Sequence, residues 1–262
     1  MRAPPWRADA GVTEAPLPPA LRYQSLAAAR QRILSAAAMR VPLVSIAQQA
    51  RALSIWNGKA VAPGDEMQLA MAFDLGVLDP LGGHRRGLDR QAQAAPPEPG
   101  SEDAVMLAAL QRPRFGLWRM LGPHPEGGAR LAPLPEGEEV WVMDRYLAAA
   151  APGAIFAARL VQPAEFAMTC GVVAPLDARA LERLLLDAPP SRGPVLPGRP
   201  ALEDAAAVDA LLAEPAARLR LKALLAQPGF AAKAYRHAID LGLVGPVPGR
   251  TPPEAMPVAP AG

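Results

Sequence analysis

The chain has few of the residues that build covalent or metal-bound frameworks. It contains one cysteine, three histidines and only 5% aromatic residues among 262 positions. A single cysteine excludes an intrachain disulfide and is typical of a reducing compartment. The histidines, His84, His124 and His237, are too scattered to form the closely spaced ligand sets of zinc or iron sites. We therefore expect no metal ion and no cofactor.

Long apolar runs are also missing. No stretch of about 18 apolar residues occurs, so the sequence predicts no membrane span. The first residues, MRAPPWRADAGVTEAP, lack the apolar segment of a secretory signal and carry Asp9 and Glu14. We expect a cytoplasmic protein that makes no contact with a membrane.

The sequence lacks the motifs of the common nucleotide-binding and hydrolytic enzymes. No G-x-x-x-x-G-K-[ST], G-x-G-x-x-G, G-x-S-x-G or H-E-x-x-H pattern is present. Lysine is scarce as well, since it occurs only at 59, 222 and 233, which leaves 24 of the 27 basic residues as arginine. Abundant Arg, Ala, Pro and Gly indicate a GC-rich bacterial genome. A net charge of +2 is below the strong basic excess of a dedicated nucleic-acid binder.

Proline is plentiful and marks the boundaries between folded regions. The 32 prolines gather near both ends, at 96–99 and at 189–200, where they oppose helix and sheet alike. The sequence thus predicts a disordered tail at 1–19, a helical N-terminal region at 20–80, a linker at 81–100, an α+β module at 101–187, a linker at 188–200, a helical C-terminal region at 201–243 and a disordered tail at 244–262.

Between Phe115 and Pro175 the helical spacing gives way to short β-branched and aromatic segments. These are FGLWRMLG, ARLAPL, EEVWVMD, GAIFAARLV and FAMTCGVV, separated by turn signals such as HPEGG and PEGE. Both faces of the strands are substantially apolar, so the sheet must be covered on each side. We expect an α+β fold, with a small antiparallel sheet or partly closed barrel flanked by N-terminal and C-terminal helices.

Three residues of this region are weak candidates for catalysis. Asp144 and Arg159 could line one end of the sheet, although an aspartate that follows a strand more often caps the next turn. Cys170 ends a strand, and a small buried core residue is the more common role for such a cysteine. A deep cavity lined by at least two of these side chains would favour an enzyme.

The N-terminal region shows the clearest charge pattern. No acidic residue occurs from Ala15 to Gly64, a segment with six basic residues. Arg30, Arg32 and Arg51 are the candidates for binding a partner or nucleic acid. Two helices joined near Pro42 are loosely compatible with a helix-turn-helix, but the usual tight turn is missing.

The β region resembles a segment of uncharacterised bacterial proteins. In that segment a strand ending in V-x-D leads to P-G-x-x-(F/L)-A-x-R and then to F-x-M-T-x-G. The matching elements here are Trp141–Asp144, Pro152–Leu160 and Phe166–Gly171, about a quarter of the chain. The resemblance implies a shared β module and transfers no activity.

The sequence leaves two classes of function open. A non-enzymatic binding or adaptor protein with a protein partner is the leading expectation, because no reactive cluster is evident. An enzyme of unrecognised type, with its site at one end of the sheet, and a weak nucleic-acid binder that uses the basic N-terminal helices are the alternatives.

Overall fold

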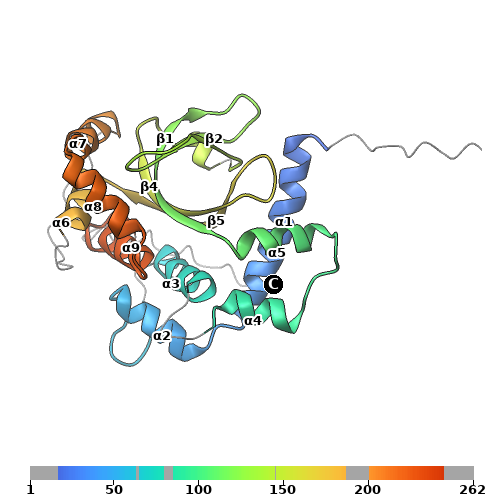
Figure 1. Cartoon of the computed structure of the whole chain (residues 1–262). Coiled ribbons are helices and arrows are strands. Elements are labelled where there is room, and N and C mark those ends of the chain that lie inside the picture. Colours follow the sequence, from blue (N-terminus) through green and yellow to red (C-terminus); the bar gives the residue numbers. More distant parts are fainter. Residues whose placement is uncertain (1–16, 63–64, 80–84, 145, 187–200, 245–262) are drawn as a thin grey trace, which may run out of the picture.

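The computed structural model describes residues 17–62, 65–79, 85–144, 146–186 and 201–244 (Figure 1). Both predicted tails, apart from 17–19 and 244, and the linker predicted at 188–200 lie outside these residues. None of the helices that the structure describes is long and apolar enough to cross a bilayer.

The five predicted strands are present, and they form one antiparallel sheet. They are β1 (Arg114–Pro123), β2 (Ala129–Pro133), β3 (Val140–Val142), β4 (Ile155–Val161) and β5 (Met168–Leu176), in the order β3-β2-β1-β4-β5. A short 3₁₀ turn, η1 (Leu147–Ala149), connects β3 to β4. The prediction of an α+β fold with a small antiparallel sheet is confirmed.

The sheet is open, so the alternative of a barrel is not supported. Among the described strands, β3 and β5 are the two edges, and only an isolated bridge joins Val142 of β3 to Ala167, the residue before β5. β3 has only three residues, which are too few to pair along the nine residues of β5. The short edge strand therefore stops the sheet from closing along its length.

Helices precede and follow the sheet. The first group is α1 (Pro19–Ala38), α2 (Leu43–Ala52), α3 (Glu66–Leu78), α4 (Gly87–Ala94) and α5 (Glu102–Leu110), and the second is α6 (Ala178–Leu186), α7 (Ala201–Ala213), α8 (Pro215–Leu225) and α9 (Phe230–Asp240). Asp65 and Ser101 cap α3 and α5 by accepting from the backbone N–H of Gln68 and Ala104.

Side chains of the sheet enter three core clusters, of which one, with Val161, Met168 and Cys170, packs against α1, α4 and α5. Trp118, Met120 and Phe156 lie on one face of the sheet, where the Trp118 indole donates to the carbonyl oxygen of Ala158 at 3.0 Å. Leu117 and Ala157 face the other side and pack against α2, α3 and α6–α9. Figure 1 shows α6–α9 on one flank of the sheet and α1, α4 and α5 on the other. All seven residues of β4 are buried, as expected for a sheet covered on both faces.

The three predicted folded regions do not have separate cores. One continuous cluster joins Met71 of α3, Ala157 of β4 and Tyr235 of α9. The region boundaries therefore mark changes in composition along the chain, while packing unites the helical regions with the sheet.

The linker predicted at 81–100 is wrong for its central part, because residues 87–94 form α4. Leu88 is fully buried, and Arg86 forms an ion pair with Asp89 at 2.7 Å in the first turn. Gly87 lets α4 approach α1, since a Cβ there would lie 2.7 Å from the carbonyl oxygen of Ala37. One buried leucine and one close glycine give too weak a periodic pattern to reveal the helix in the sequence.

We predict that Gly87→Ala destabilises the protein by about 1–3 kcal/mol, because the added methyl group overpacks the contact between α4 and α1. The usual effect of this substitution inside a helix is the opposite, a gain of about 0.5–1 kcal/mol. Urea denaturation measures the difference, with the exposed Gln93→Ala in the same helix as the control. A gain in stability for Gly87→Ala would show that α4 does not pack closely against α1.

Candidate functional site

A buried ion network joins the sheet to helices from both ends of the chain. The Arg159 guanidinium of β4 donates from Nε to Asp74 Oδ2 of α3 at 2.8 Å, and its Nη2 lies 2.7 Å from Asp79 Oδ2. The second contact is an ion pair whose geometry does not make a hydrogen bond. The Tyr235 hydroxyl of α9 also donates to Asp74 Oδ2, at 3.1 Å. The side chains of Asp74 and Arg159 are only 3% and 4% exposed.

Burial and charge act on these groups in opposite directions. Burial raises the pKa of the Asp74 carboxyl above its ordinary value, and the nearby Arg159 guanidinium only partly opposes the rise. For Arg159, burial alone would lower the pKa, but Asp74 and Asp79 outweigh burial and raise it. Burial and then the Asp74 carboxylate raise the pKa of Tyr235 well above its usual range, so its hydroxyl remains a hydrogen-bond donor.

A β-bulge lies opposite Arg159. The pairing of β4 with β5 shifts between Ala158 and Leu160, whose partners are Val173 and Thr169, so β5 holds extra residues at this point. Gly171 lies within the bulge with φ +119°, a conformation that residues with a Cβ rarely adopt. The bulge bends the edge strand beside the ion network.

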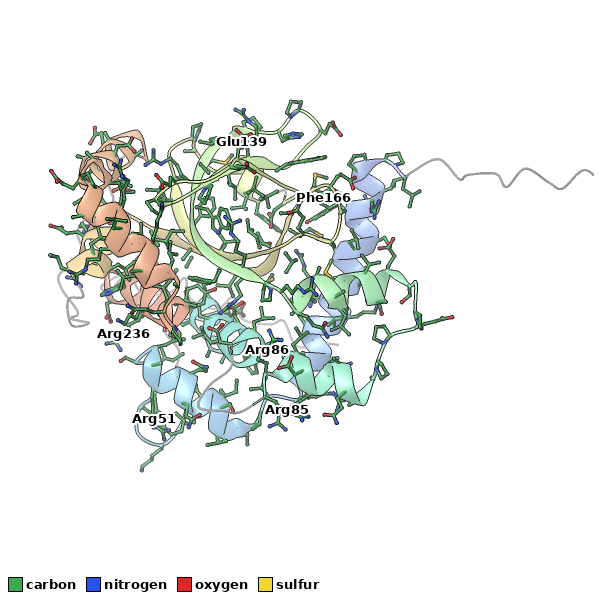
Figure 2. The ribbon with its side chains drawn as sticks, in the orientation of Figure 1. Arg51, Arg85, Arg86, Glu139, Phe166 and Arg236 are labelled. Carbon is green, nitrogen blue, oxygen red and sulfur yellow. The ribbon has the colours of Figure 1, made fainter. Side chains whose placement is uncertain are left out.

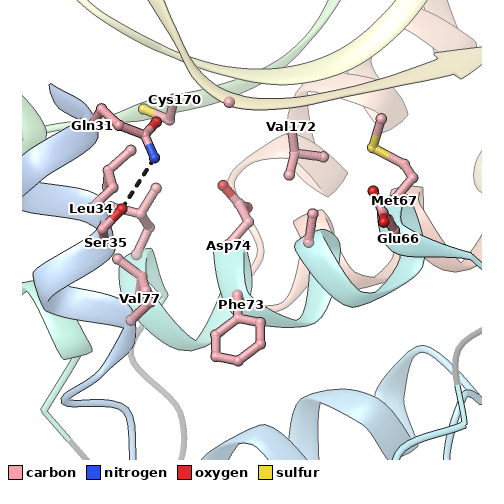
Figure 3. A pocket seen from close by; sticks show the side chains of 14 residues that line it. Gln31, Leu34, Ser35, Glu66, Met67, Phe73, Asp74, Val77, Cys170 and Val172 are labelled. Atoms are coloured by element: carbon pink, nitrogen blue, oxygen red, sulfur yellow. Dashed lines mark hydrogen bonds between the residues drawn. The ribbon is translucent and has the colours of Figure 1, made fainter. Parts of the chain in front are cut away.

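A cavity of about 480 Å³ opens between α1, α3 and the bulge of β5. Its walls are mostly apolar, and its polar side chains are Gln31, Ser35, Glu66, Asp74 and Cys170. In Figure 3 the Asp74 carboxylate points from α3 toward β5, in the middle of the lining residues. Gln31 donates to Ser35 on the α1 wall, at 3.1 Å. A concave apolar site with a few converging polar groups is the usual form of a small-molecule site.

Cys170 lines this cavity, but its environment is unsuited to nucleophilic catalysis. The residue is 6% exposed, and burial, followed by the Asp74 carboxylate, raises the pKa of its thiol to about 12. A reactive cysteine needs the thiolate at neutral pH, and the shift is in the opposite direction. Cys170 therefore acts as a small apolar wall residue of the cavity.

Asp144 has a structural role away from the cavity. Its Oδ1 accepts from the backbone N–H groups of Tyr146 and Leu147, at 2.9 and 3.2 Å, and its Oδ2 accepts from the Thr169 hydroxyl at 2.7 Å. The carboxylate thus caps the turn that leads into η1, as the more common sequence interpretation predicts. Of the three catalytic candidates, only Cys170 lines the cavity, and no hydrogen bond or ion pair between described residues joins Asp144 to Arg159.

The three basic candidates contact three different parts of the structure. Arg30 donates to the carbonyl oxygen of Thr169 in β5, Arg32 pairs with Asp103 of α5, and Arg51 lies over the Trp56 ring at 4.7 Å. The positive charge of the acid-free segment is therefore partly neutralised by Asp103 of α5. The structure does not assemble these arginines into one continuous basic face.

Sequence reasoning missed Asp74, Asp79 and Tyr235. Asp74 offered one signal, because it is a lone charge between Phe73 and Leu75 in an otherwise apolar segment. A charged side chain within a buried apolar segment needs an oppositely charged or hydrogen-bonding partner in the core. The partner, Arg159, lies 85 residues further along the chain.

Comparison with known proteins adds no information on function. No family model, no curated protein and no solved structure matches the chain. The resemblance to uncharacterised bacterial proteins stays a prediction. Within the described residues, no group of three or more His, Cys, Asp or Glu side chains is placed to hold a metal ion.

We predict that Arg159→Met lowers the free energy of unfolding by about 3–5 kcal/mol at pH 7, because two carboxylates lose their buried counter-charge. The folded-state pKa of Asp74 is raised, so its contribution to stability is greatest at low pH and is lost as the pH rises through that pKa. Without Arg159 the pKa of Asp74 rises further, so more of this carboxyl is protonated at pH 5 than at pH 7. The variant should therefore lose less stability at pH 5 than at pH 7. Urea denaturation at both pH values measures the free energy of unfolding.

The exposed ion pair of Arg32 supplies the control, since Arg32→Met should leave the stability nearly unchanged at either pH. Equal losses for Arg159→Met at the two pH values would contradict the raised pKa of Asp74.

We also predict that iodoacetamide modifies native Cys170 at pH 8 at least about 100-fold more slowly than it modifies the urea-unfolded chain, because both burial and the raised pKa remove the reactive thiolate. The chain has a single cysteine, so intact-mass spectrometry follows one product. Similar rates in the two states would restore Cys170 as a candidate nucleophile.

Proposed function

We propose that the chain is a non-enzymatic binding module that docks a partner protein at the corner between α1 and α2. The observation that carries the proposal is a group of three large apolar side chains with high exposure: Met39, Leu43 and Val44 are 88%, 87% and 55% exposed. They lie within six residues of the chain, at the end of α1 and the start of α2. We name these three residues the corner patch. Clustered exposed apolar side chains mark interaction surfaces more often than single ones.

The candidate catalytic residues support a binding role over an enzymatic one. A cavity lined by at least two of Asp144, Arg159 and Cys170 would favour an enzyme, and the cavity takes only Cys170. Arg159 forms ion pairs with two carboxylates, and Asp144 accepts hydrogen bonds from the backbone of the turn that follows it. Each therefore has a sufficient structural explanation.

Basic side chains border the corner patch and define the charge of the partner. Arg40 follows Met39 directly and donates to Gln91 of α4. Arg51 is seven residues after Val44, two helical turns, so both lie on the same side of α2. Figure 2 shows Arg51 and Arg85 on the side of the molecule formed by α2 and α4. An apolar patch with a basic border fits an amphipathic helix that carries acidic residues beside its apolar face.

The test uses two synthetic fluorescent peptides with the same leucine-based apolar face, one flanked by Glu and the other by Lys. We expect the native chain to bind the acidic peptide more tightly, in fluorescence anisotropy at about 50 mM salt, because Arg40 and Arg51 attract the one and repel the other. The double variant Met39→Ser/Leu43→Ser should weaken acidic-peptide binding at least about tenfold, because the apolar anchors carry most of the affinity.

The matched control is Leu219→Ser, which removes an apolar side chain that is 67% exposed on α8. It should leave peptide binding unchanged. Equal affinity for both peptides, or full binding by the double variant, would contradict the proposal. Self-association in sedimentation that the double variant abolishes would assign the patch to a second copy instead. Salt-sensitive binding to duplex DNA that Arg51→Gln weakens would assign the surface to nucleic acid.

A further inference from the structure

The cavity between α1, α3 and β5 contains a carboxylate oxygen that the fold leaves without a partner. Both hydrogen bonds that Asp74 accepts end on Oδ2, from Arg159 and Tyr235. Among the described residues, none donates to Oδ1. The Asp74 residue is 7% exposed and lines the cavity, so this acceptor is largely shielded from bulk water. A carboxylate oxygen that borders a cavity and has no protein donor can accept a hydrogen bond from a ligand.

The charges around the cavity define the kind of donor. Asp74 and Asp79 share one guanidinium, which leaves one negative charge in excess when both are ionised. Glu66 at the start of α3 adds a second carboxylate to the lining. Among the described residues that line the cavity, none is Arg, Lys or His. An anionic ligand would be repelled, whereas a cation would be attracted to the excess negative charge.

The walls and the volume of the cavity indicate the size and polarity of the part of the ligand that carries no charge. Leu34, Val77 and Val172 supply apolar walls on α1, α3 and β5. Gly171 in the bulge keeps the β5 side open, because no atom lies within 4 Å of a Cβ built there. A volume of about 480 Å³ lies within the range of small-molecule sites, roughly 300–1,000 Å³.

We propose that this cavity binds a small organic amine, with its ammonium group against Oδ1 of Asp74 and its apolar body between α1, α3 and the bulge of β5. The cavity is separate from the corner patch, so this proposal does not depend on the proposed docking of a partner.

The test compares three probes that share one apolar ring and differ in the polar group: cyclohexylmethylamine, cyclohexylmethanol and cyclohexanecarboxylate. Titration calorimetry of the full chain at pH 7 should give binding of the amine at least roughly tenfold tighter than that of the alcohol, because a charge-assisted hydrogen bond replaces a neutral one. The carboxylate should bind most weakly. Equal binding of the amine and the alcohol would overturn the proposal.

Two variants locate the interaction. Asp74→Asn should reduce amine binding to the level of the alcohol, because the amide keeps the shape and removes the charge. Tyr235→Phe removes a hydrogen bond to the same carboxylate without changing its charge, so it should keep the preference for the amine. A preference that survives in Asp74→Asn would place the amine elsewhere and overturn the assignment.

A blocking variant tests the cavity without touching the buried network. Ser35 is exposed on the α1 wall, and Ser35→Trp should fill the cavity and abolish amine binding. Gln24→Trp, at an exposed position three helical turns earlier on the same helix, should leave binding intact. Amine bound in the cavity should also slow the alkylation of Cys170, a readout that does not depend on Asp74. Full amine binding by Ser35→Trp, or alkylation that the amine does not slow, would contradict the proposed location.

Discussion

The relative positions of β4, α3 and α9 depend on one buried charge, the Arg159 guanidinium. It lies in the central part of β4 and contacts the carboxylates of Asp74 in α3 and of Asp79, which directly follows α3. Tyr235 of α9 donates a hydrogen bond to Asp74. A buried charge without its counter-charge is costly, so the three elements must approach one another in this one arrangement. The apolar core around the network allows many packings of similar energy, whereas the ion network allows few.

The same network explains why the cavity between α1, α3 and β5 lies where it does. Arg159 occupies one oxygen of Asp74, and the β5 strand bulges opposite Arg159 instead of pairing tightly across it. The bulge and the Asp74 carboxylate line the space beside α1 (Figure 3). The site is therefore a consequence of how the fold accommodates its buried charge.

The molecule presents two surfaces of opposite chemistry on neighbouring helices. The corner patch is apolar with a basic border, and the cavity is apolar with carboxylates. The partners that we propose differ accordingly, an acidic helix for the corner patch and an amine for the cavity. α1 contributes to both, through Met39 at its end and Ser35 one turn earlier.

The sequence by itself determined the strands, the antiparallel pairing and the turn at Asp144, because alternation and turn chemistry act over a few residues. It also placed Arg159 and Cys170 in strands. Tertiary structure alone decided that α4 folds against α1, that the sheet remains open, and that Asp74 meets Arg159 across 85 residues. These features depend on contacts between elements distant in the chain, and the spacing of residues along the sequence carries no record of which distant side chains become neighbours.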